Sequence, residues 1–118
     1  EYFNNLNKNK FDEAVSYLSE SVLFSFNKDE IDIDGHDKLK IQLKRWKEKL
    51  DKNNLYLKLH EIESIKIWSR MTMVDVKQGE YDLISNDIVR EIRRYYYFVN
   101  FGEVGWKIIS IADAKIEN

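Results

Sequence analysis

The sequence predicts a single α+β domain, with helices in the first half of the chain and long strands in the second. Residues 88–117 are apolar over two stretches joined by the glycine-flanked residues 102–105, a pattern typical of a hairpin of two strands. Residues 39–50 repeat apolar side chains at helical spacing. The chain has 118 residues, of which 43% are hydrophobic, so it can bury one substantial core.

The composition excludes several function classes. Charged residues make up 34% of the chain and the net charge is -2, which argues against a protein that binds polyanions such as nucleic acids. Without cysteine the chain can form no disulfide, thiol nucleophile or cysteine zinc site. No apolar run approaches the ~20 residues that cross a bilayer, so we expect no membrane partner. The compartment stays open, with the cytoplasm as the default expectation.

The first 35 residues predict two short helices and two strands. A short helix fits Tyr2, Phe3 and Leu6, and residues 11–18 carry an apolar stripe at i, i+3, i+4 and i+7. These helices would form a helical hairpin. Residues 21–26 alternate in the manner of a strand, and residues 28–35 alternate isoleucine with acids, which predicts a second short strand.

The third helix is the clearest element of the first half. Leu39, Leu43, Trp46 and Leu50 lie at i, i+4, i+7 and i+11 and form one apolar stripe. Asp37 suits the cap or first turn, where the helix dipole favours an anion. The opposite face is rich in lysine and arginine, which predicts a solvated surface. Residues 51–54 end the helix.

The rest of the chain predicts strands. Residues 55–68 form one long strand with a bulge near Glu63 and Ser64, because the apolar parity changes there. Residues 68–70 make a turn, residues 71–77 return antiparallel, and a bend is expected at Gln78 and Gly79. We find no linker and no internal repeat. The whole chain, residues 1–118, is therefore expected to be one domain.

Several stretches together resemble the nuclear transport factor 2-like superfamily, which includes ketosteroid isomerases and polyketide-cyclase-like proteins. They are "KFDEAVSYLSESVLFSF", "DGHDKLKIQLKRW", "IESIKIWSRMTMVDV" and "RRYYYFVNFGEVGWKIISI". The resemblance covers nearly the whole chain and implies a cystatin-like α+β cone. In such a cone a strongly curved, mostly antiparallel sheet wraps around the long third helix, a helical hairpin precedes it, and a pocket opens inside. This fold hosts isomerases, cyclases, dehydratases and association domains, so it does not select a function.

Asp75 and His60 are the candidate catalytic residues. Asp75 interrupts an apolar strand; if Met71 and Met73 face the interior, Asp75 does too, and burial would make it a general base. If Val74 and its neighbours of the other parity face inward, Asp75 is an ordinary charge on the outer face, and this interpretation is favoured. His60 could face the pocket, although a histidine bonded to a neighbour is the simpler interpretation.

The candidate ligand-binding residues are aromatic: Tyr17, Trp46, Tyr95 and Tyr97. The run of tyrosines at residues 95–97 could also stack on single-stranded nucleic acid. Adjacent strand residues point to opposite faces, however, so core or dimer packing is favoured and no nucleic-acid partner is expected.

No metal site and no cofactor are expected. The acidic residues 30–35 suggest a calcium loop, but Ile41 stands at the twelfth position, where that loop requires glutamate. His36 and His60 follow no metal-ligand spacing.

We expect a non-catalytic module that binds a small apolar ligand or associates with protein. The alternative is a small-molecule isomerase, cyclase or dehydratase that uses a pocket acid as general base. A homodimer is also expected, because three helices can cover only one face of a sheet whose strands are apolar on both. The set ranked first for this interface is Tyr96, Phe98, Ile109 and Ile111, and the set ranked second is Tyr95, Tyr97, Trp106 and Ile108.

Overall fold

The structure of the protein, a computed structural model, describes residues 2–26 and 29–113. Within them the first half holds α1 (Tyr2–Asn7), α2 (Phe11–Ser16), β1 (Leu18–Phe26), β2 (Asp29–Asp34) and α3 (His36–Lys52). The second half holds β3 (Leu55–Ile67), β4 (Met71–Asp82), β5 (Ile88–Asn100) and β6 (Trp106–Asp113), with a 3₁₀ turn at Gly102–Val104. Residue 28 of the expected acidic strand and residues 114–117 of the expected last strand lie outside the described residues.

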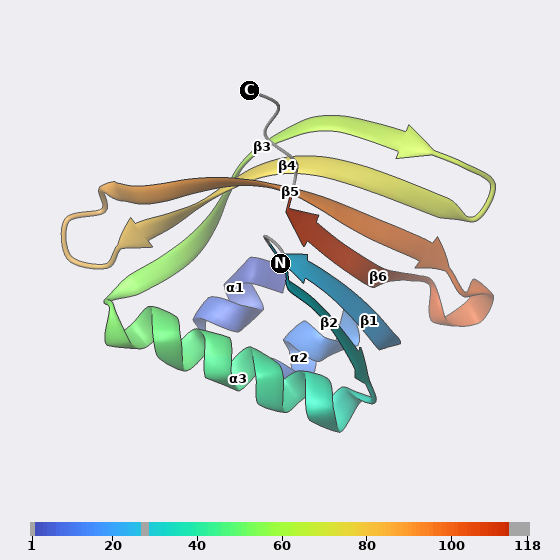
Figure 1. Ribbon diagram of the computed structural model, residues 1–118, viewed down its shortest axis with the longest axis horizontal. Coiled ribbons are helices and arrows are strands. Elements are labelled where there is room, and N and C mark those ends of the chain that lie inside the picture. The colour runs from blue at the N-terminus through green and yellow to red at the C-terminus, as the bar shows by residue number, and fades with distance from the viewer. Residues whose placement is uncertain (1, 27–28, 114–118) are drawn as a thin grey trace.

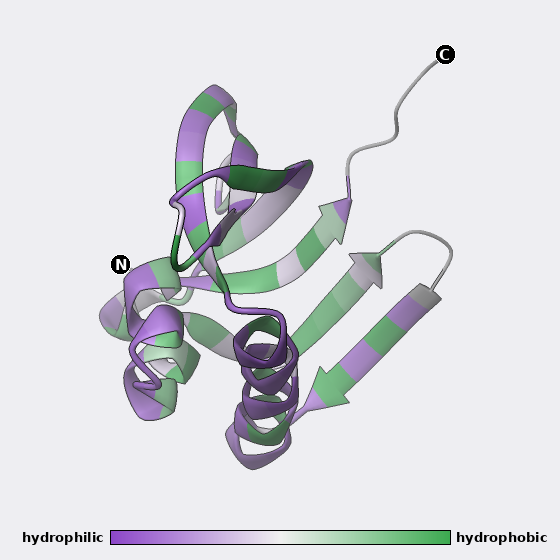
Figure 2. Ribbon diagram, turned by 90° about the vertical axis from the view of Figure 1, so that its left-hand side faces the viewer, coloured by the Kyte–Doolittle hydropathy of each residue, from purple (hydrophilic) through white to green (hydrophobic). Residues whose placement is uncertain are grey.

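The strands of the described chain form one six-stranded sheet in the order β2-β1-β6-β5-β4-β3. Neighbouring strands are antiparallel except β1 and β6, which run parallel. The sheet is bent, and α1, α2 and α3 all lie on its concave side (Figure 1). Figure 2 shows the same arrangement from the side, with α3 between the other two helices and β2. The predicted α+β cone, with a mostly antiparallel sheet curved over a long helix, is confirmed.

Helix α3 packs its apolar stripe against the sheet, as the sequence predicts. Leu39 and Leu43 are completely buried. Trp46 and Leu50, one and two turns further on, are half-buried and line a cavity. The helix begins after Gly35, whose φ of 96° lies in the region that favours glycine. One end of the stripe therefore belongs to the core and the other end to a pocket.

The core lies between the helices and the concave face of the sheet. Val22 and Phe24 of β1 are buried there together with Leu18, the first residue of that strand. Leu18 was expected to end the stripe of the second helix. That helix instead ends at Ser16, and Leu18 reaches the same core from the strand.

Strand β4 determines which residues face the helices. Val76 belongs to the core cluster and Val74 packs against it, whereas Asp75 pairs across the sheet with Tyr95. Side chains alternate along a strand, so Asp75 lies on the outer, convex face. Asp75 is nevertheless only 4% exposed, because neighbouring side chains of that face cover it.

The bend expected at Gln78 and Gly79 is wrong. Strand β4 continues without a break to Asp82, and both residues are fully paired with β3 and β5. Glycine inside a strand often marks a site of close approach rather than a turn. Here the His60 ring of β3 occupies the space above Gly79, where a Cβ would stand 2.6 Å from its Nε2 atom.

The bulge expected near Glu63 is confirmed, since the register of β3 against β4 shifts between Ile62 and Ser64. A second shift, between Leu59 and Glu61, was not predicted. The described chain contains no helix with the length and apolar character needed to cross a membrane.

The interface set ranked first is wrong, because Tyr96 and Ile111 lie in the core under the helices. The second set is split between the two faces. Tyr97 pairs with Ser110 but Phe98 pairs with Ile108, which leaves Ile109 as an extra residue on β6. Such a bulge changes the parity of the strand. Tyr95 and Tyr97 therefore face outward while Ile108 is buried in the core.

Candidate functional site

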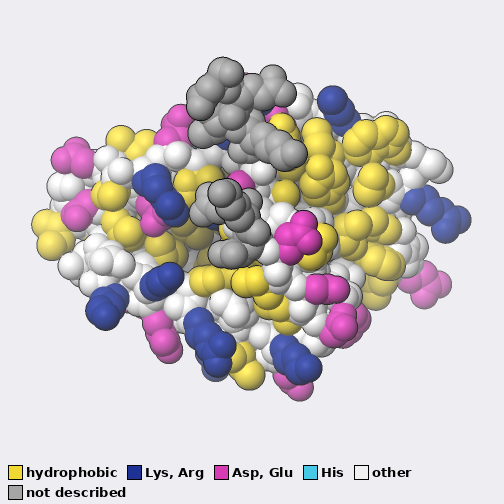
Figure 3. All heavy atoms as spheres, in the orientation of Figure 1, with side chains coloured by type: hydrophobic (Ala, Val, Ile, Leu, Met, Phe, Trp, Pro, Cys, Tyr) yellow, Lys and Arg dark blue, Asp and Glu magenta, His cyan; other side chains and the backbone are white. Residues whose placement is uncertain are grey.

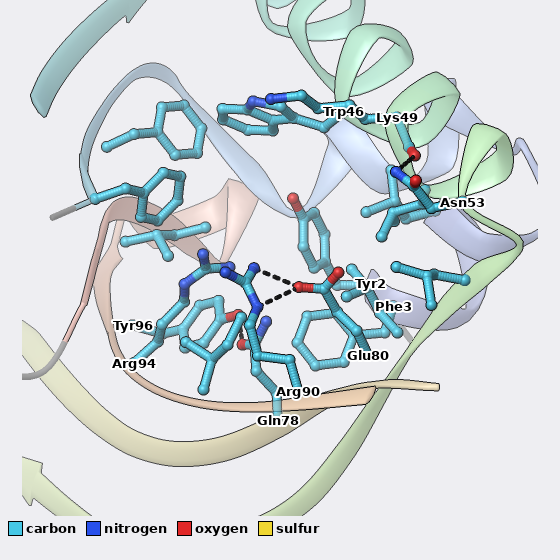
Figure 4. Close-up of a pocket in the computed structure, with 18 residues that line it drawn as sticks. Tyr2, Phe3, Trp46, Lys49, Asn53, Gln78, Glu80, Arg90, Arg94 and Tyr96 are labelled. Atoms are coloured by element: carbon cyan, nitrogen blue, oxygen red, sulfur yellow. Dashed lines mark hydrogen bonds and ion pairs between the residues drawn. The ribbon is translucent and has the colours of Figure 1, made fainter. Parts of the chain in front are cut away.

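A cavity of about 260 Å³ lies between the C-terminal half of α3 and the concave face of the sheet. Trp46 of α3 stands on one side of it and Tyr96 and Gln78 of the sheet on the opposite side (Figure 4). The volume lies just below the ~300–1,000 Å³ range of ligand pockets. The aromatic residues of its lining come from α1, β1, α3 and β5: Tyr2, Phe3, Phe24, Phe26, Trp46 and Tyr96.

Aromatic packing holds one wall of the cavity in place. The Trp46 ring meets Phe24 and Phe26 edge to face, with centroids 4.9 Å and 5.7 Å apart. Such contacts are favourable beyond the area that they bury. The Arg94 guanidinium lies over the Phe26 ring, 4.1 Å from its centroid, which is cation–π geometry. This wall is therefore built by side chains that fix one another.

The sheet side of the cavity carries a buried polar network. The Tyr96 hydroxyl donates to Gln78 Oε1, and both side chains are buried. Burial raises the pKa of the Tyr96 phenol above its usual range, and the nearby Arg94 guanidinium opposes that rise through its charge and a hydrogen bond. The Gln78 amide nitrogen has no acceptor among the residues that the structure describes. A residue that lines the cavity thus carries a buried donor without a partner.

Two ion pairs border the cavity. Arg90 donates to Glu80 Oε1 from both Nε, at 2.7 Å, and Nη2. Arg94 Nε donates to Asp113 at 2.9 Å. Arg90 is largely exposed, whereas Glu80 is 9% exposed. Each guanidinium of the lining is thus matched by a carboxylate.

Tyr2 adds a second buried phenol to the cavity. Its ring packs against Phe3 with centroids 5.8 Å apart. Burial raises the pKa of the Tyr2 phenol well above its usual range, and the charge of Arg94 opposes this shift only in part. Both phenols of the lining therefore stay protonated at neutral pH and can act as hydrogen-bond donors or acceptors.

Of the residues singled out from the sequence, the structure brings Trp46 to the cavity and places Asp75 away from it. Both Asp75 oxygens accept hydrogen bonds from Arg93, at 3.0 Å from Nε and 2.6 Å from Nη2. The Asp75 carboxylate raises the pKa of the Arg93 guanidinium further above its usual range. On the outer face and held by two donors, Asp75 is not placed to act as a base on a molecule in the cavity.

His60 also lies on the outer face. Its Nδ1 is 2.9 Å from Glu91 Oε2, and its Nε2 bonds to the Tyr81 hydroxyl. The imidazole thus joins three neighbouring strands at one end of the sheet. It does not line the cavity.

The other three candidates are aromatic residues outside the cavity lining. Tyr95 and Tyr97 lie half-buried on the outer face of the sheet. Tyr17 follows α2, and its carbonyl accepts from the backbone N–H of Ile108. The Tyr17 side chain is partly buried and packs against the core.

The polar residues of the cavity were missed at the sequence level. Gln78 and Glu80 share the parity of Val74 and Val76 on β4. The sequence predicts the end of this strand at Lys77, because Gly79 suggests a bend, and so the alternation of inward and outward side chains was not extended to Gln78 and Glu80. Following the apolar alternation through the glycine would have placed both polar side chains on the inner face, opposite Ile92 and Arg90.

A second hollow, of about 620 Å³, lies between α2, the start of α3 and the turn before β6. Its prominent polar groups are already engaged within the chain. Lys40 pairs with Asp12 at 2.6 Å, and the Lys107 ammonium donates to the Ser16 carbonyl at 2.6 Å. His36 Nε2 is 3.1 Å from the Leu18 carbonyl. We therefore take the aromatic cavity as the candidate site.

No protein-family model matches the chain, and no curated protein is similar to it in sequence. Solved structures match it closely in shape. A nuclear transport factor 2-like protein with a cystatin-like fold from Novosphingobium aromaticivorans superposes with a TM-score of 0.78 at 9% identity, covering 99% of this chain and 76% of the other.

Two further structures are similar over nearly the full length. A candidate calcium/calmodulin-dependent protein kinase type II association domain from Thiobacillus denitrificans matches with a TM-score of 0.75 at 7% identity, covering 98% of this chain and 90% of the other. A candidate ketosteroid isomerase from Parabacteroides distasonis matches with a TM-score of 0.62 at 14% identity, covering 97% and 85%. At such low identities the likeness concerns the fold alone. The chain therefore has the cystatin-like fold of these nuclear transport factor 2-like structures.

Proposed function

We propose that this domain binds a small, largely apolar molecule in the cavity between α3 and the sheet, without transforming it. The observation that carries the proposal is the lining: six aromatic side chains from four elements surround a cavity of about 260 Å³. Aromatic and apolar walls with a few convergent polar groups are typical of small-molecule sites. The polar groups here are the buried Gln78 amide, the phenols of Tyr2 and Tyr96, and the ion pairs at the border.

The state of the acids supports binding rather than catalysis. A general base must be free to take a proton within hydrogen-bond reach of the substrate. Glu80, the carboxylate of the lining, already accepts two hydrogen bonds from Arg90. Asp75 and His60 lie on the opposite face of the sheet. A base working in the cavity would first have to break an ion pair.

Nuclear magnetic resonance tests the proposal through the indole N–H signals of the three tryptophans. Trp68→Phe and Trp106→Phe variants assign the Trp46 signal. Titration with cumene, a compact apolar probe, should shift the Trp46 signal and leave those of Trp68 and Trp106 in place. If cumene near its solubility limit leaves the Trp46 signal unmoved, the proposed function is wrong.

A matched pair of variants locates the binding site. Ile92 lines the cavity, and Ile88 lies on the same strand outside it and is 50% exposed. Ile92→Phe adds volume inside the cavity and should weaken cumene binding. Ile88→Phe makes the same chemical change and should leave cumene binding unchanged.

A second proposal concerns the outer face of the sheet, which we infer pairs with a second copy of the chain. The helices lie on the concave side of the sheet, so no helix of the described residues covers the opposite face (Figure 1). Met73, Tyr95 and Tyr97 lie there close together on paired strands. Figure 3 shows hydrophobic side chains gathered over the end of the strands where the β3–β4 and β5–β6 turns lie. Large amphipathic rings of this kind are frequent at interfaces.

Sedimentation equilibrium at micromolar concentration tests the homodimer. The expected mass is twice that of the 14.2 kDa chain. Tyr97→Glu would place a charge in the interface and should give monomers. Ile41→Glu alters a residue of α3 that is 52% exposed and should leave the mass unchanged. A wild-type mass of one chain would rule the dimer out.

A further inference from the structure

We propose that the cavity selects a neutral ligand with a hydrogen-bond acceptor, a ketone, amide or similar carbonyl on a ring, which the Gln78 side-chain amide recognises. This inference rests on the proposed binding function and specifies the ligand class. Its starting observation is Gln78, a cavity-lining residue that is only 1% exposed and whose amide nitrogen has no acceptor in the described chain. An unpaired buried donor is costly, so an acceptor supplied from the cavity is strongly favoured.

The hydrogen bond from Tyr96 determines which end of the Gln78 amide is left without a partner. The Tyr96 hydroxyl donates its single proton to Gln78 Oε1. The nearby Arg94 guanidinium has only donors and cannot compete for that proton. The carbonyl end of Gln78 is thereby engaged. Its NH₂ end is the part left for a ligand.

The charges around the cavity favour a neutral acceptor over an anion. Arg90 and Arg94 are each matched by a carboxylate, Glu80 and Asp113. A ligand carboxylate would have to displace one of these partners or enter beside the buried Glu80 charge. Lys49, at the border of the cavity, is exposed and hydrated, and it is weakly suited to hold an anion. Among the described residues, the fully buried side-chain polar atom without a partner belongs to an uncharged amide.

Three small probes of nearly the same shape separate these possibilities: acetophenone, cumene and benzoate. Acetophenone has a neutral acceptor, cumene has a methyl group in its place, and benzoate is an anion. We expect acetophenone to shift the side-chain NH₂ signals of Gln78 in the wild-type protein. Cumene should bind, as the Trp46 indole signal reports, without that hydrogen-bond shift. This comparison needs no variant.

The variant Gln78→Met keeps the length of the side chain and removes its donor. We expect the acetophenone dissociation constant to rise roughly fivefold to a hundredfold, the usual range for losing such a hydrogen bond. The cumene constant should change less than about twofold. Gln42→Met makes the same replacement on α3 outside the cavity and should change neither constant.

The outcomes distinguish the two proposals. If no probe shifts the Trp46 signal, the proposed binding function is wrong, and the proposed ligand class, which depends on it, is wrong as well. If cumene binds but Gln78→Met weakens acetophenone and cumene equally, the binding function stands and the ligand class is wrong. Tighter binding of benzoate than of acetophenone by the wild type also overturns the ligand class. If Gln78→Met does not fold, the NH₂ signals of Gln78 in the wild-type protein provide the test. The proposal is contradicted if acetophenone does not shift these signals more than cumene does.

Discussion

The imidazole ring of His60 lies over Gly79 of the adjacent strand, so that a Cβ on Gly79 would stand 2.6 Å from Nε2 and 2.7 Å from Cε1. Such distances are far below van der Waals contact. The glycine makes room for a histidine that bonds to Glu91 on one side and to Tyr81 on the other. Gly79 is therefore required by a side chain of another strand and not by a turn.

Gly79→Ala should destabilise the protein by about 1–3 kcal/mol, the usual cost of overpacking a filled site. The His60 ring would have to move and would lose its partners. In a His60→Ala background the same substitution should cost little, because the conflict is gone. Urea denaturation of the four proteins of this double-mutant cycle measures the coupling. Equal costs of Gly79→Ala in both backgrounds would contradict the packing argument.

Trp46→Ala should lower the free energy of unfolding by ~3–5 kcal/mol, the range for removing a large aromatic side chain from a packed site. Its ring packs against Phe24 and Phe26 and also borders the cavity. Chemical denaturation measures the loss. A loss below ~1 kcal/mol would mean that Trp46 contributes only to the rim of the pocket.

Much of the fold could be predicted from the sequence because it depends on local periodicity. The apolar stripe of residues 39–50 predicts helix α3, and the long apolar runs of the second half predict strands of the sheet. The sequence could not predict which β6 side chains face the core, because this depends on a bulge at Ile109 that appears only in the pairing with β5. A shift of one residue exchanges the two faces of a strand.

The candidate site was less accessible to sequence reasoning. Trp46 was found because it completes a helical stripe, and it does line the cavity. Gln78 was missed because the adjacent Gly79 was interpreted as a turn. A sequence pattern does not distinguish a glycine in a turn from a glycine that leaves room for a side chain of the neighbouring strand, here His60. Asp75 attracted attention as an acid in an apolar strand. Its partner Arg93, 18 residues away, became apparent only from the strand register.

Asp75→Asn should leave the affinity of the cavity for cumene unchanged, because Asp75 faces away from it. The same change should lower stability measurably, since the neutral amide offers Arg93 one acceptor in place of a charged pair of oxygens. Arg93→Lys should also destabilise, because a single ammonium cannot reproduce the two-pronged contact. The measurements are urea denaturation and the Trp46 indole signal. A large loss of cumene affinity in folded Asp75→Asn would argue that Asp75 acts on the cavity.

Stability should fall at alkaline pH because two phenols are buried. Burial raises the pKa of Tyr2 and of Tyr96 above the value near 10 that they have in the unfolded chain. Above about pH 10 the unfolded state loses these protons while the folded state keeps them. The stability is thus fully present below the unfolded pKa and is lost as the pH rises toward the folded pKa.

Each such phenol should contribute a slope of up to about -1.4 kcal/mol per pH unit to the free energy of unfolding above pH ~10. Urea denaturation between about pH 8 and pH 11 measures this slope. Tyr96→Phe should reduce this slope by close to the contribution of one phenol. The variant also loses its hydrogen bond to Gln78, but that loss applies at every pH. Tyr95→Phe, which removes a phenol from the outer face, is the matched control and should keep the steeper slope. If the Tyr96→Phe and wild-type slopes are equal, the Tyr96 phenol does not retain its proton on folding, and the buried network around Gln78 is not arranged as described.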